Sequence, residues 1–265
     1  MTVNVNAAKQ KAKHVILIGM DGWGAYSVSK ADIPAIKSLM TNGCYTLHSR
    51  SVLPSSSAIN WASMFMGVGT ELHGYTTWGS KTPEIPSREV NERGIAPTIF
   101  SVLREQRPKA EIGCLYEWPG IKYLVDTLAM SYQYQTPGYA KAPTALCEAA
   151  EKYIIEKKPE LLAICFEEPD HTGHTKGHDT PAYYQMLKEL DGYVERILQA
   201  IKKAGIWDDT IIIMTADHGG IKTGHGGKTL REMEIPFIIS GKNVRKGMEI
   251  KESMMQYDTC LLYTS

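Results

Sequence analysis

Two side chains that commonly bind metals stand together in the segment 215–220 (TADHGG). The segment follows the apolar run 211–214 (IIIM), which is short and β-branched enough to be a buried strand. Aspartate offers a hard oxygen, histidine a borderline nitrogen, and the two glycines let the backbone turn away beneath an ion. Taken alone, a polar turn at the end of a strand would be the better interpretation of Asp217 and His218. Three other segments favour a metal site instead.

These three segments carry residues of the same kind, each beyond a predicted strand or at the start of a predicted helix. They contain Asp21 after residues 14–20, Ser57 before the apolar helix predicted at 58–66, and Asp170 with His174 after residues 161–166. A further candidate, His225, follows His218 by seven residues. Five of the eight histidines fall between positions 171 and 225. A single histidine of this kind is usually a core residue whose ring is hydrogen-bonded inside the protein and binds no metal. That interpretation is a poor explanation for five histidines that lie close to aspartates in the sequence.

The spacing of these residues indicates more than one ion. Asp170 and His174 are four residues apart, so that both can face one ion across a turn. The adjacent pair Asp217 and His218 projects in different directions, which suits an ion at the end of a strand. The whole set of seven oxygen and nitrogen groups exceeds the ligands of one zinc and fits two ions, each with an open position. Aspartate and histidine without thiolate favour zinc or manganese over calcium or magnesium.

Ser57 has the properties of a nucleophile. A serine hydroxyl bound to a metal loses its proton more easily, and the first N–H groups of a helix can hold an anionic oxygen. The structural alternative is that the serine run 55–57 merely caps the helix, a role that is compatible with catalysis.

The elements that must position these residues alternate between strands and helices. We expect strands at 14–20, 44–53, 110–116, 161–166, 211–215 and 236–240, helices at 34–40, 58–66, 97–105, 121–130, 144–157 and 181–204, and an ordered loop at 69–93. Near-continuous apolar strands of this kind predict an α/β three-layer sandwich, with helices on both faces of a mostly parallel central sheet. Ligands of such folds gather beyond the carboxyl ends of the strands.

One catalytic domain at 14–259 accounts for this pattern, with a polar tail at 1–13 and a tail at 260–265 that we expect to be non-native. Lysine plus arginine equals aspartate plus glutamate, 29 each, so that no overall field attracts nucleic acid or an anionic membrane. No apolar run approaches the length of a membrane span, the five scattered cysteines indicate buried thiols, and the N-terminus has no apolar export signal. Localisation and oligomeric state stay open.

A family resemblance rests on five short segments. These are Asp21-Gly22, Pro54 to Asn60, Glu168 to His174, Asp217-His218-Gly219 and His225-Gly226. In this order they resemble the alkaline phosphatase superfamily, and most closely its nucleotide pyrophosphatase/phosphodiesterase branch, over residues 21–241. The resemblance implies a two-zinc hydrolase of small phosphoesters that forms a covalent phospho-enzyme, with manganese as the alternative metal. Relatives of this kind are often periplasmic or extracellular.

The resemblance also implies roles for individual residues. One zinc would be held by Asp170, His174 and His225, and the other by Asp21, Asp217 and His218 with Ser57 coordinated as the nucleophile. Ser57 stands where that branch usually has threonine. Asn60 matches an asparagine that supports the nucleophile loop. The expected substrate-binding residues are Ala58 and Trp78.

Two departures from the family pattern bear on the substrate. Trp78 occupies the position of an asparagine that donates to the phosphoryl group, and it would either stack on a substrate ring or simply cover the core. Only six residues separate His218 from His225, where relatives that cleave nucleotides have a large insertion, so we expect a more open site.

Other activities within the superfamily are weighed by the residues around Ser57. The sulfatase pattern Cys/Ser-x-Pro-x-Arg is absent, which argues against a sulfatase. Monoesterases usually add positive charge, and no arginine lies near Ser57 in the sequence, although Lys222 and Lys228 flank His225. Phosphodiesters or phosphonates are therefore favoured. A phosphomonoesterase, a phosphotransferase and a degenerate metal-binding protein without activity remain the alternatives.

Overall fold

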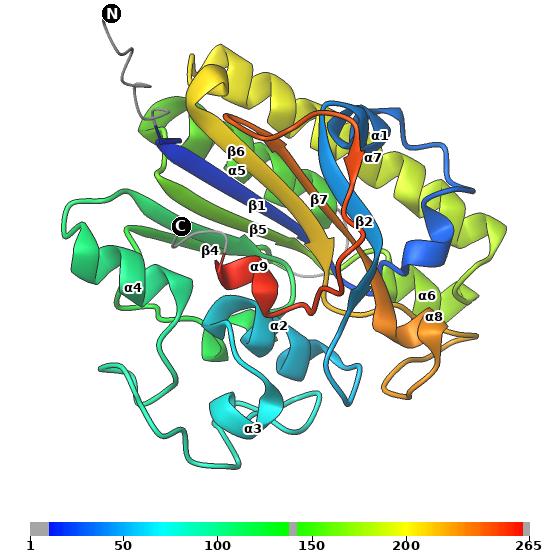
Figure 1. Ribbon diagram of the computed structural model, residues 1–265, viewed down its shortest axis with the longest axis horizontal. Coiled ribbons are helices and arrows are strands. Elements are labelled where there is room, and N and C mark those ends of the chain that lie inside the picture. Colours follow the sequence, from blue (N-terminus) through cyan, green and yellow to red (C-terminus); the bar gives the residue numbers. More distant parts are fainter. Residues whose placement is uncertain (1–10, 138–141, 262–265) are drawn as a thin grey trace, which may run out of the picture.

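The computed structural model describes residues 11–137 and 142–261. Its centre is a sheet of eight strands in the order β4-β3-β5-β1-β6-β7-β2-β8 (Figure 1). The strands are β1 (His14–Met20), β2 (Gly43–Arg50), β3 (Ile112–Tyr116), β4 (Tyr132–Gln135), β5 (Leu161–Phe166), β6 (Thr210–Ala216), β7 (Glu234–Gly241) and β8 (Met248–Glu249). The helices are α1 (Pro34–Thr41), α2 (Ser57–Met66), α3 (Thr70–His73), α4 (Ile99–Gln106), α5 (Ala142–Lys157), α6 (Asp170–Lys176), α7 (Pro181–Lys203), α8 (Leu230–Met233) and α9 (Asp258–Leu261). Short 3-10 turns are η1 (Ala25–Ser27), η2 (Pro119–Tyr123) and η3 (Trp207–Asp209).

The five strands from β4 to β6 run parallel, which agrees with the mostly parallel sheet predicted from the apolar segments, although β4 itself is not one of them. Among the eight strands described, β7 runs antiparallel to its neighbours β6 and β2. Strand β1 lies between β5 and β6, and its last residue Met20 is in register with both Phe166 and Ala216. Strands β5, β1 and β6 therefore end at the same edge of the sheet, and the residues that follow these strands meet there.

Two apolar cores cover the two faces of the sheet. Along β1, Ile16 and Ile18 pack on the face of α1, α5 and α7, whereas Leu17 packs on the face of α2 and α4. This alternation is the expected two-residue period of a strand buried on both sides. Figure 1 shows these helices on opposite sides of the sheet, which confirms the predicted arrangement of layers.

Helix α7 follows the predicted pattern closely. Its stripe from Tyr183 to Ile201, at steps of three and four residues, is buried against the sheet. Thr180 caps the helix by accepting a hydrogen bond from the amide of Tyr183, and Pro181 occupies the first turn, where its missing N–H costs nothing.

The helix predicted at 121–130 is wrong. The chain instead forms the short turn η2, a further turn and the strand β4, which the sequence did not predict. The reason is local, because the Asp126 side chain accepts from the amide of Leu128 and its carbonyl accepts from the amide of Ala129, so that a turn replaces the helix. Leu124 and Val125 are buried by this turn without helical periodicity.

Several smaller findings complete the fold. The segment 69–93 is an ordered loop, as expected, with the one-turn helix α3 inside it. Helix α6 was not predicted and begins directly at Asp170. In the described ranges no helix is long and apolar enough to cross a membrane, and Cys44, Cys114, Cys147 and Cys165 are free and buried. Most of both predicted tails lies outside the described residues.

Candidate two-metal site

The candidate residues lie at the carboxyl ends of three adjacent strands and at the start of one helix. Asp21 follows β1, Asp170 opens α6 just beyond β5, and Asp217 with His218 follows β6. The loop after β6 brings back His225, and α2 begins with Ser57. Since β5, β1 and β6 are neighbours in the sheet, side chains separated by up to about 200 residues converge at one edge.

The first group contains Asp21, Asp217 and His218, all of them buried. Nε2 of His218 lies 3.4 Å from Oδ1 of Asp21 and 3.2 Å from Oδ2 of Asp217. The hydroxyl oxygen of Ser57 lies 3.2 Å from the same nitrogen. Three further potential ligand atoms therefore lie within 3.4 Å of Nε2 of His218.

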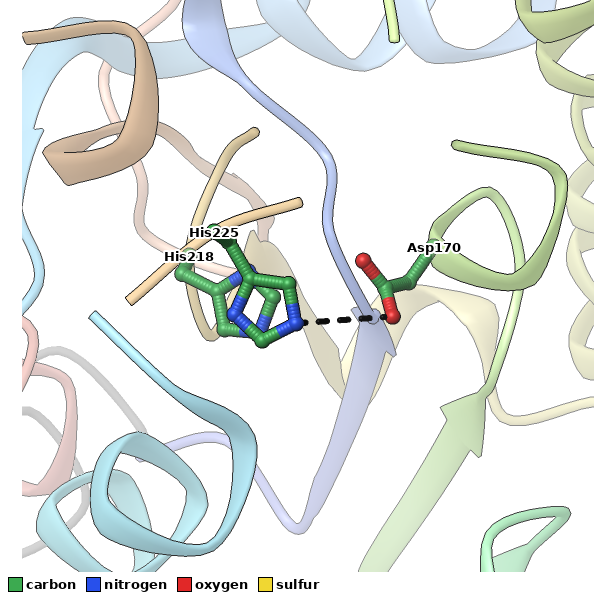
Figure 2. A group of neighbouring side chains, drawn as sticks. All are labelled: Asp170, His218 and His225. Atoms are coloured by element: carbon green, nitrogen blue, oxygen red, sulfur yellow. Dashed lines mark ion pairs between the residues drawn. The ribbon is translucent and has the colours of Figure 1, made fainter. Parts of the chain in front are cut away.

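The second group contains Asp170, His174 and His225. Nε2 of His174 lies 3.1 Å from Oδ2 of Asp170 and 3.1 Å from Nε2 of His225, and the distance from that nitrogen to the Asp170 oxygen is 3.8 Å. Figure 2 shows Asp170 and His225 facing each other, with the ring of His218 stacked against that of His225 at 3.7 Å between centroids. Ligand atoms of Asp170, His218 and His225 also lie within 4.8 Å of one another, so the two groups adjoin.

Each of the three histidines is held through the ring nitrogen that faces away from the site. Nδ1 of His218, His174 and His225 contacts the carbonyl oxygens of Gly219, Thr223 and Ser55 at 2.8, 2.8 and 3.0 Å, respectively. A carbonyl oxygen only accepts, so Nδ1 carries the hydrogen in each ring and Nε2 is directed into the groups. Histidine ligands of metals are usually held in this way.

The carboxylates are held by one oxygen and leave the other toward the site. Oδ2 of Asp21 accepts from the indole N–H of Trp61 at 3.1 Å, and Oδ1 of Asp217 accepts from the amides of Gly22 and His218 at 3.1 and 2.8 Å. Their second oxygens, Oδ1 of Asp21 and Oδ2 of Asp217, are buried and accept no hydrogen bond from any described residue.

This buried environment shifts the protonation equilibria. Burial raises the pKa of Asp21 and of Asp217 well above the usual range, and the nearby carboxylates add to the shift. Burial also lowers the pKa of His218 to about 3, so that its Nε2 carries a lone pair at neutral pH. A divalent cation between these atoms would offset the repulsion of their lone pairs and favour the ionised carboxylates.

In the second group burial disfavours ionisation of Asp170, but the hydrogen bond from His174 and the neighbouring histidines lower its pKa to about 2. The same hydrogen bond raises the pKa of His174 to about 9, so a proton lies between the two side chains at neutral pH. A metal ion would compete with that proton, because metal binding requires the neutral imidazole. The donor set, three carboxylates and three imidazoles without thiolate, fits zinc or manganese.

The sequence did not single out Trp61, which fixes Asp21. Its indole is buried over Gly19, where a Cβ atom would lie 2.3 Å from the ring. Trp61 stands four residues after Ser57 on α2, so it shares the helix face of the nucleophile. That spacing is the only sequence signal for its position beside Asp21.

The loop that carries Ser57 is tied on two sides. The Asn60 side chain accepts from the amide of Val52 at 2.8 Å and donates to the carbonyls of Pro54 and Ser56 at 3.0 and 3.1 Å. On the other side, the Ser55 hydroxyl donates to the carbonyl of Gly227 at 2.7 Å, within the loop of His225. The loops of Ser57 and His225 are therefore fixed relative to each other.

The two expected substrate-binding residues contact each other through the backbone. The amide of Ala58 donates to the carbonyl of Trp78 at 3.3 Å, so that this N–H is already engaged. Trp78 is 67% exposed, which argues against the alternative that it covers the core. Its loop is ordered by Glu84, which accepts from the amide of Thr76 and the hydroxyl of Ser80 at 2.8 and 2.6 Å.

Parallel strands with an acidic and histidine-rich edge, helices on both faces and a serine at a helix start define an alkaline phosphatase-like fold. Residues 15–236 match the family model of type I phosphodiesterase / nucleotide pyrophosphatase. The chain belongs to this family.

Known proteins with similar sequences are remote. The bis(5'-adenosyl)-triphosphatase enpp4 of Mus musculus is 24% identical over 226 residues, which cover 81% of this chain and 48% of the relative. Ectonucleotide pyrophosphatase/phosphodiesterase family member 3 of the same species is 26% identical over 219 residues, covering 77% of this chain and 24% of the relative. The chain thus spans at most about half the length of these relatives.

Solved structures show the same fold at low identity. Murine ectonucleotide pyrophosphatase/phosphodiesterase 5, inactive and in complex with AMP, has a TM-score of 0.74 at 17% identity and covers 96% of this chain and 94% of its own. The phosphonate monoester hydrolase of Agrobacterium radiobacter has a TM-score of 0.71 at 15% identity, with coverage of 95% and 74%. A 2-O GAG sulfatase has a TM-score of 0.74 at 13% identity, with coverage of 93% and 68%.

Proposed function

We propose that this protein is a metal-dependent hydrolase of phosphoric esters, phosphodiesters or phosphonates, that acts through a covalent intermediate on Ser57. The observation that carries the proposal is the position of the Ser57 hydroxyl, 3.2 Å from Nε2 of His218 and at the start of α2. A serine in this position can act as the nucleophile because a metal ion held beside it by His218 would lower the pKa of its hydroxyl, and the helix start favours an anion.

Two zinc ions, or manganese, would be held by the two groups. Asp21, Asp217 and His218 would form one site with Ser57, and Asp170, His174 and His225 the other. Bound ions of this kind lower the pKa of a hydroxyl or water and stabilise the charge on phosphoryl oxygens. The orphaned buried oxygens of Asp21 and Asp217 support this assignment.

The reaction proceeds in two displacements at phosphorus. Oγ of Ser57 forms a bond to phosphorus as the bond to the leaving alcohol breaks, and that alcohol departs with a proton. Water then attacks the same phosphorus, the bond to Oγ breaks, and the serine recovers its proton. A phosphodiester thus yields one alcohol and one phosphomonoester. Asn60 supports the loop that presents Ser57 throughout, through its hydrogen bonds to residues 52–56.

The substrate is a small phosphoester with a ring beside the phosphorus. Trp78 is exposed next to the amide of Ala58, where an indole can stack on a flat group. Two similar proteins, a bis(5'-adenosyl)-triphosphatase and an ectonucleotide pyrophosphatase/phosphodiesterase in complex with AMP, support a substrate of this size. The short connection between His218 and His225 supports a more open site than a nucleotide enzyme with a large insertion would have.

The test is the Ser57→Ala variant with bis-p-nitrophenyl phosphate as substrate. We expect turnover to fall by at least about a thousandfold, because the attacking group is removed. Two metal ions should remain bound, because Asp21, Asp217 and His218 still hold the ion beside Ser57. The Ser57→Thr variant is the matched control and should retain activity, since it keeps a hydroxyl. Full activity of Ser57→Ala would exclude this serine as the nucleophile.

The alternatives differ in measurable ways. A metal-loaded screen over monoesters, diesters, phosphonates and sulfate esters separates a phosphomonoesterase from a diesterase. For the monoesterase, Lys222 or Lys228, two exposed residues that flank His225 in the sequence, would have to contribute positive charge. Products formed with added alcohols would reveal a phosphotransferase. Two bound metals without turnover on any phosphoester would favour a degenerate binding protein.

A further inference from the structure

His178 is a buried histidine that no role assigned above explains. It lies between α6 and α7, and its side chain has no exposed surface. Neither ring nitrogen has a hydrogen-bond partner among the residues that the structure describes. Its Nε2 lies 3.5 Å from Oδ1 of Asp170, and that buried oxygen also accepts no hydrogen bond in the described ranges. A buried donor and a buried acceptor thus face each other just beyond hydrogen-bond length.

The fold leaves this ring little freedom to move. A Cβ atom on Gly173 of α6 would lie 2.2 Å from the ring, and one on Gly220, beyond β6, would lie 2.1 Å from it. The ring of Tyr183 closes a further side at 5.5 Å between centroids, and the His178 amide donates to the carbonyl of Lys222 at 2.6 Å. Two glycines therefore make the space for an imidazole behind Asp170.

Comparison of the three site carboxylates indicates what this imidazole does. In Asp21 and in Asp217, one oxygen faces the site and the other accepts a hydrogen bond, from Trp61 or from backbone amides. In Asp170, Oδ2 faces His174, and Oδ1 points toward His178. The ring of His178 stands where the other two carboxylates have their donor.

We infer that His178 is the positioning residue of Asp170. Its Nε2–H donates to Oδ1 once the gap closes by a few tenths of an ångström, and this bond holds Oδ2 toward the ion shared with His174 and His225. The inference rests on the proposed function only in taking Asp170 as a metal ligand. Outer donors of this kind typically account for a ten- to hundredfold change in metal affinity.

The experiment measures zinc affinity of the full chain by competition with a chromogenic chelator. We expect the His178→Phe variant, which keeps the ring and loses the donor, to bind one of its two zinc ions 10- to 100-fold more weakly. The His178→Gln variant, whose amide can donate, should recover part of that loss. The control is His171→Phe, at an exposed position on α6, which should bind zinc like the wild type. If His178→Phe does not fold, His178→Leu replaces it.

A double-mutant cycle separates positioning from packing. In the Asp170→Ala background, His178→Phe should change zinc affinity less than threefold, because the oxygen on which it acts is gone. An equal loss in both backgrounds, unchanged affinity of His178→Phe, or absence of zinc binding by the wild type would overturn the inference. A wild type that binds zinc and shows no turnover of bis-p-nitrophenyl phosphate overturns the proposed function and leaves this inference standing.

Discussion

Nε2 of His174 and Nε2 of His225 lie only 3.1 Å apart, although the two residues are 51 positions apart in sequence. In each ring the Nδ1–H group donates a hydrogen bond to a backbone carbonyl. Two imidazole nitrogens at this distance can share one proton or one cation, and repel each other with neither. Asp170 supplies the counter-charge beside them. The second group is thus built for a positive charge that either a proton or a metal ion can provide.

Competition between proton and metal predicts that zinc binding releases protons. The pKa of His174 is raised to about 9 by its hydrogen bond to Asp170, so this histidine is protonated at pH 7 and must lose its proton to bind zinc. We expect at least one proton per chain to be released on zinc binding at pH 7. The contribution of His174 to this release should fall as the pH rises past 9, because its ring is then already neutral. Titration in a weak buffer, or calorimetry in buffers of different ionisation enthalpy, measures this number. Release that does not fall in the His174→Ala variant would contradict the assignment.

Removal of the metals should lower the stability of the fold. Each ion that binds only the folded chain raises the free energy of unfolding by about 2.7 kcal/mol when the free ion concentration is a hundred times the Kd. For a chain of this size that corresponds to a rise in Tm of roughly 5 to 11 °C per site. Thermal unfolding with excess zinc and with a chelator measures the difference. A Tm that is unchanged by chelation, in protein with a measured metal content, would exclude this contribution.

Trp78 should affect substrate binding and leave the fold unchanged. Because the Trp78 side chain is 67% exposed, the free energy of unfolding of the Trp78→Ala variant should lie within about 0.5 kcal/mol of the wild-type value. For an aromatic diester we expect KM to rise roughly tenfold with a small change in kcat, since stacking contributes about 1–3 kcal/mol. The Trp207→Ala variant is the control, because Trp207 precedes β6 at the opposite end of the strand. Equal effects of both substitutions would remove Trp78 from the substrate site.

Much of the site could be predicted because the strands around it are parallel and apolar. The runs that form β1, β5 and β6 are recognisable in sequence, and polar residues just after such strands must share an edge. What could not be predicted depends on contacts between distant segments. In the sequence Trp61 is an ordinary apolar helix residue, and only the fold places its indole beside Asp21. The position of His178 depends on two glycines in other segments, which leave space for its ring. The turn at Asp126 replaced an expected helix because local side-chain hydrogen bonds outweighed an apolar pattern.

Glu117 lies near the site and was not expected from the sequence to matter. It follows β3, is only 5% exposed, and accepts from the amide of Glu167 at 2.8 Å. Burial raises the pKa of Glu117 to about 8, above the ordinary value of 4.5, despite that hydrogen bond. A raised pKa means that the folded state binds the proton more tightly than the unfolded state. The stabilisation is therefore complete below pH 4.5 and is lost as the pH rises through about 8.

The Glu117→Gln variant should consequently flatten the pH dependence of stability in this window. Glutamine keeps the acceptor for the Glu167 amide and cannot ionise. We expect the variant and the wild type to have similar free energies of unfolding near pH 5, and the variant to be more stable at pH 8.5 by at most about 5 kcal/mol. Urea unfolding of both proteins, saturated with metal, at a series of pH values measures the difference. The control is Glu89→Gln, at an exposed glutamate, which should follow the wild type throughout. A constant offset between Glu117→Gln and the wild type from pH 5 to 8.5 would show that Glu117 does not titrate in this range.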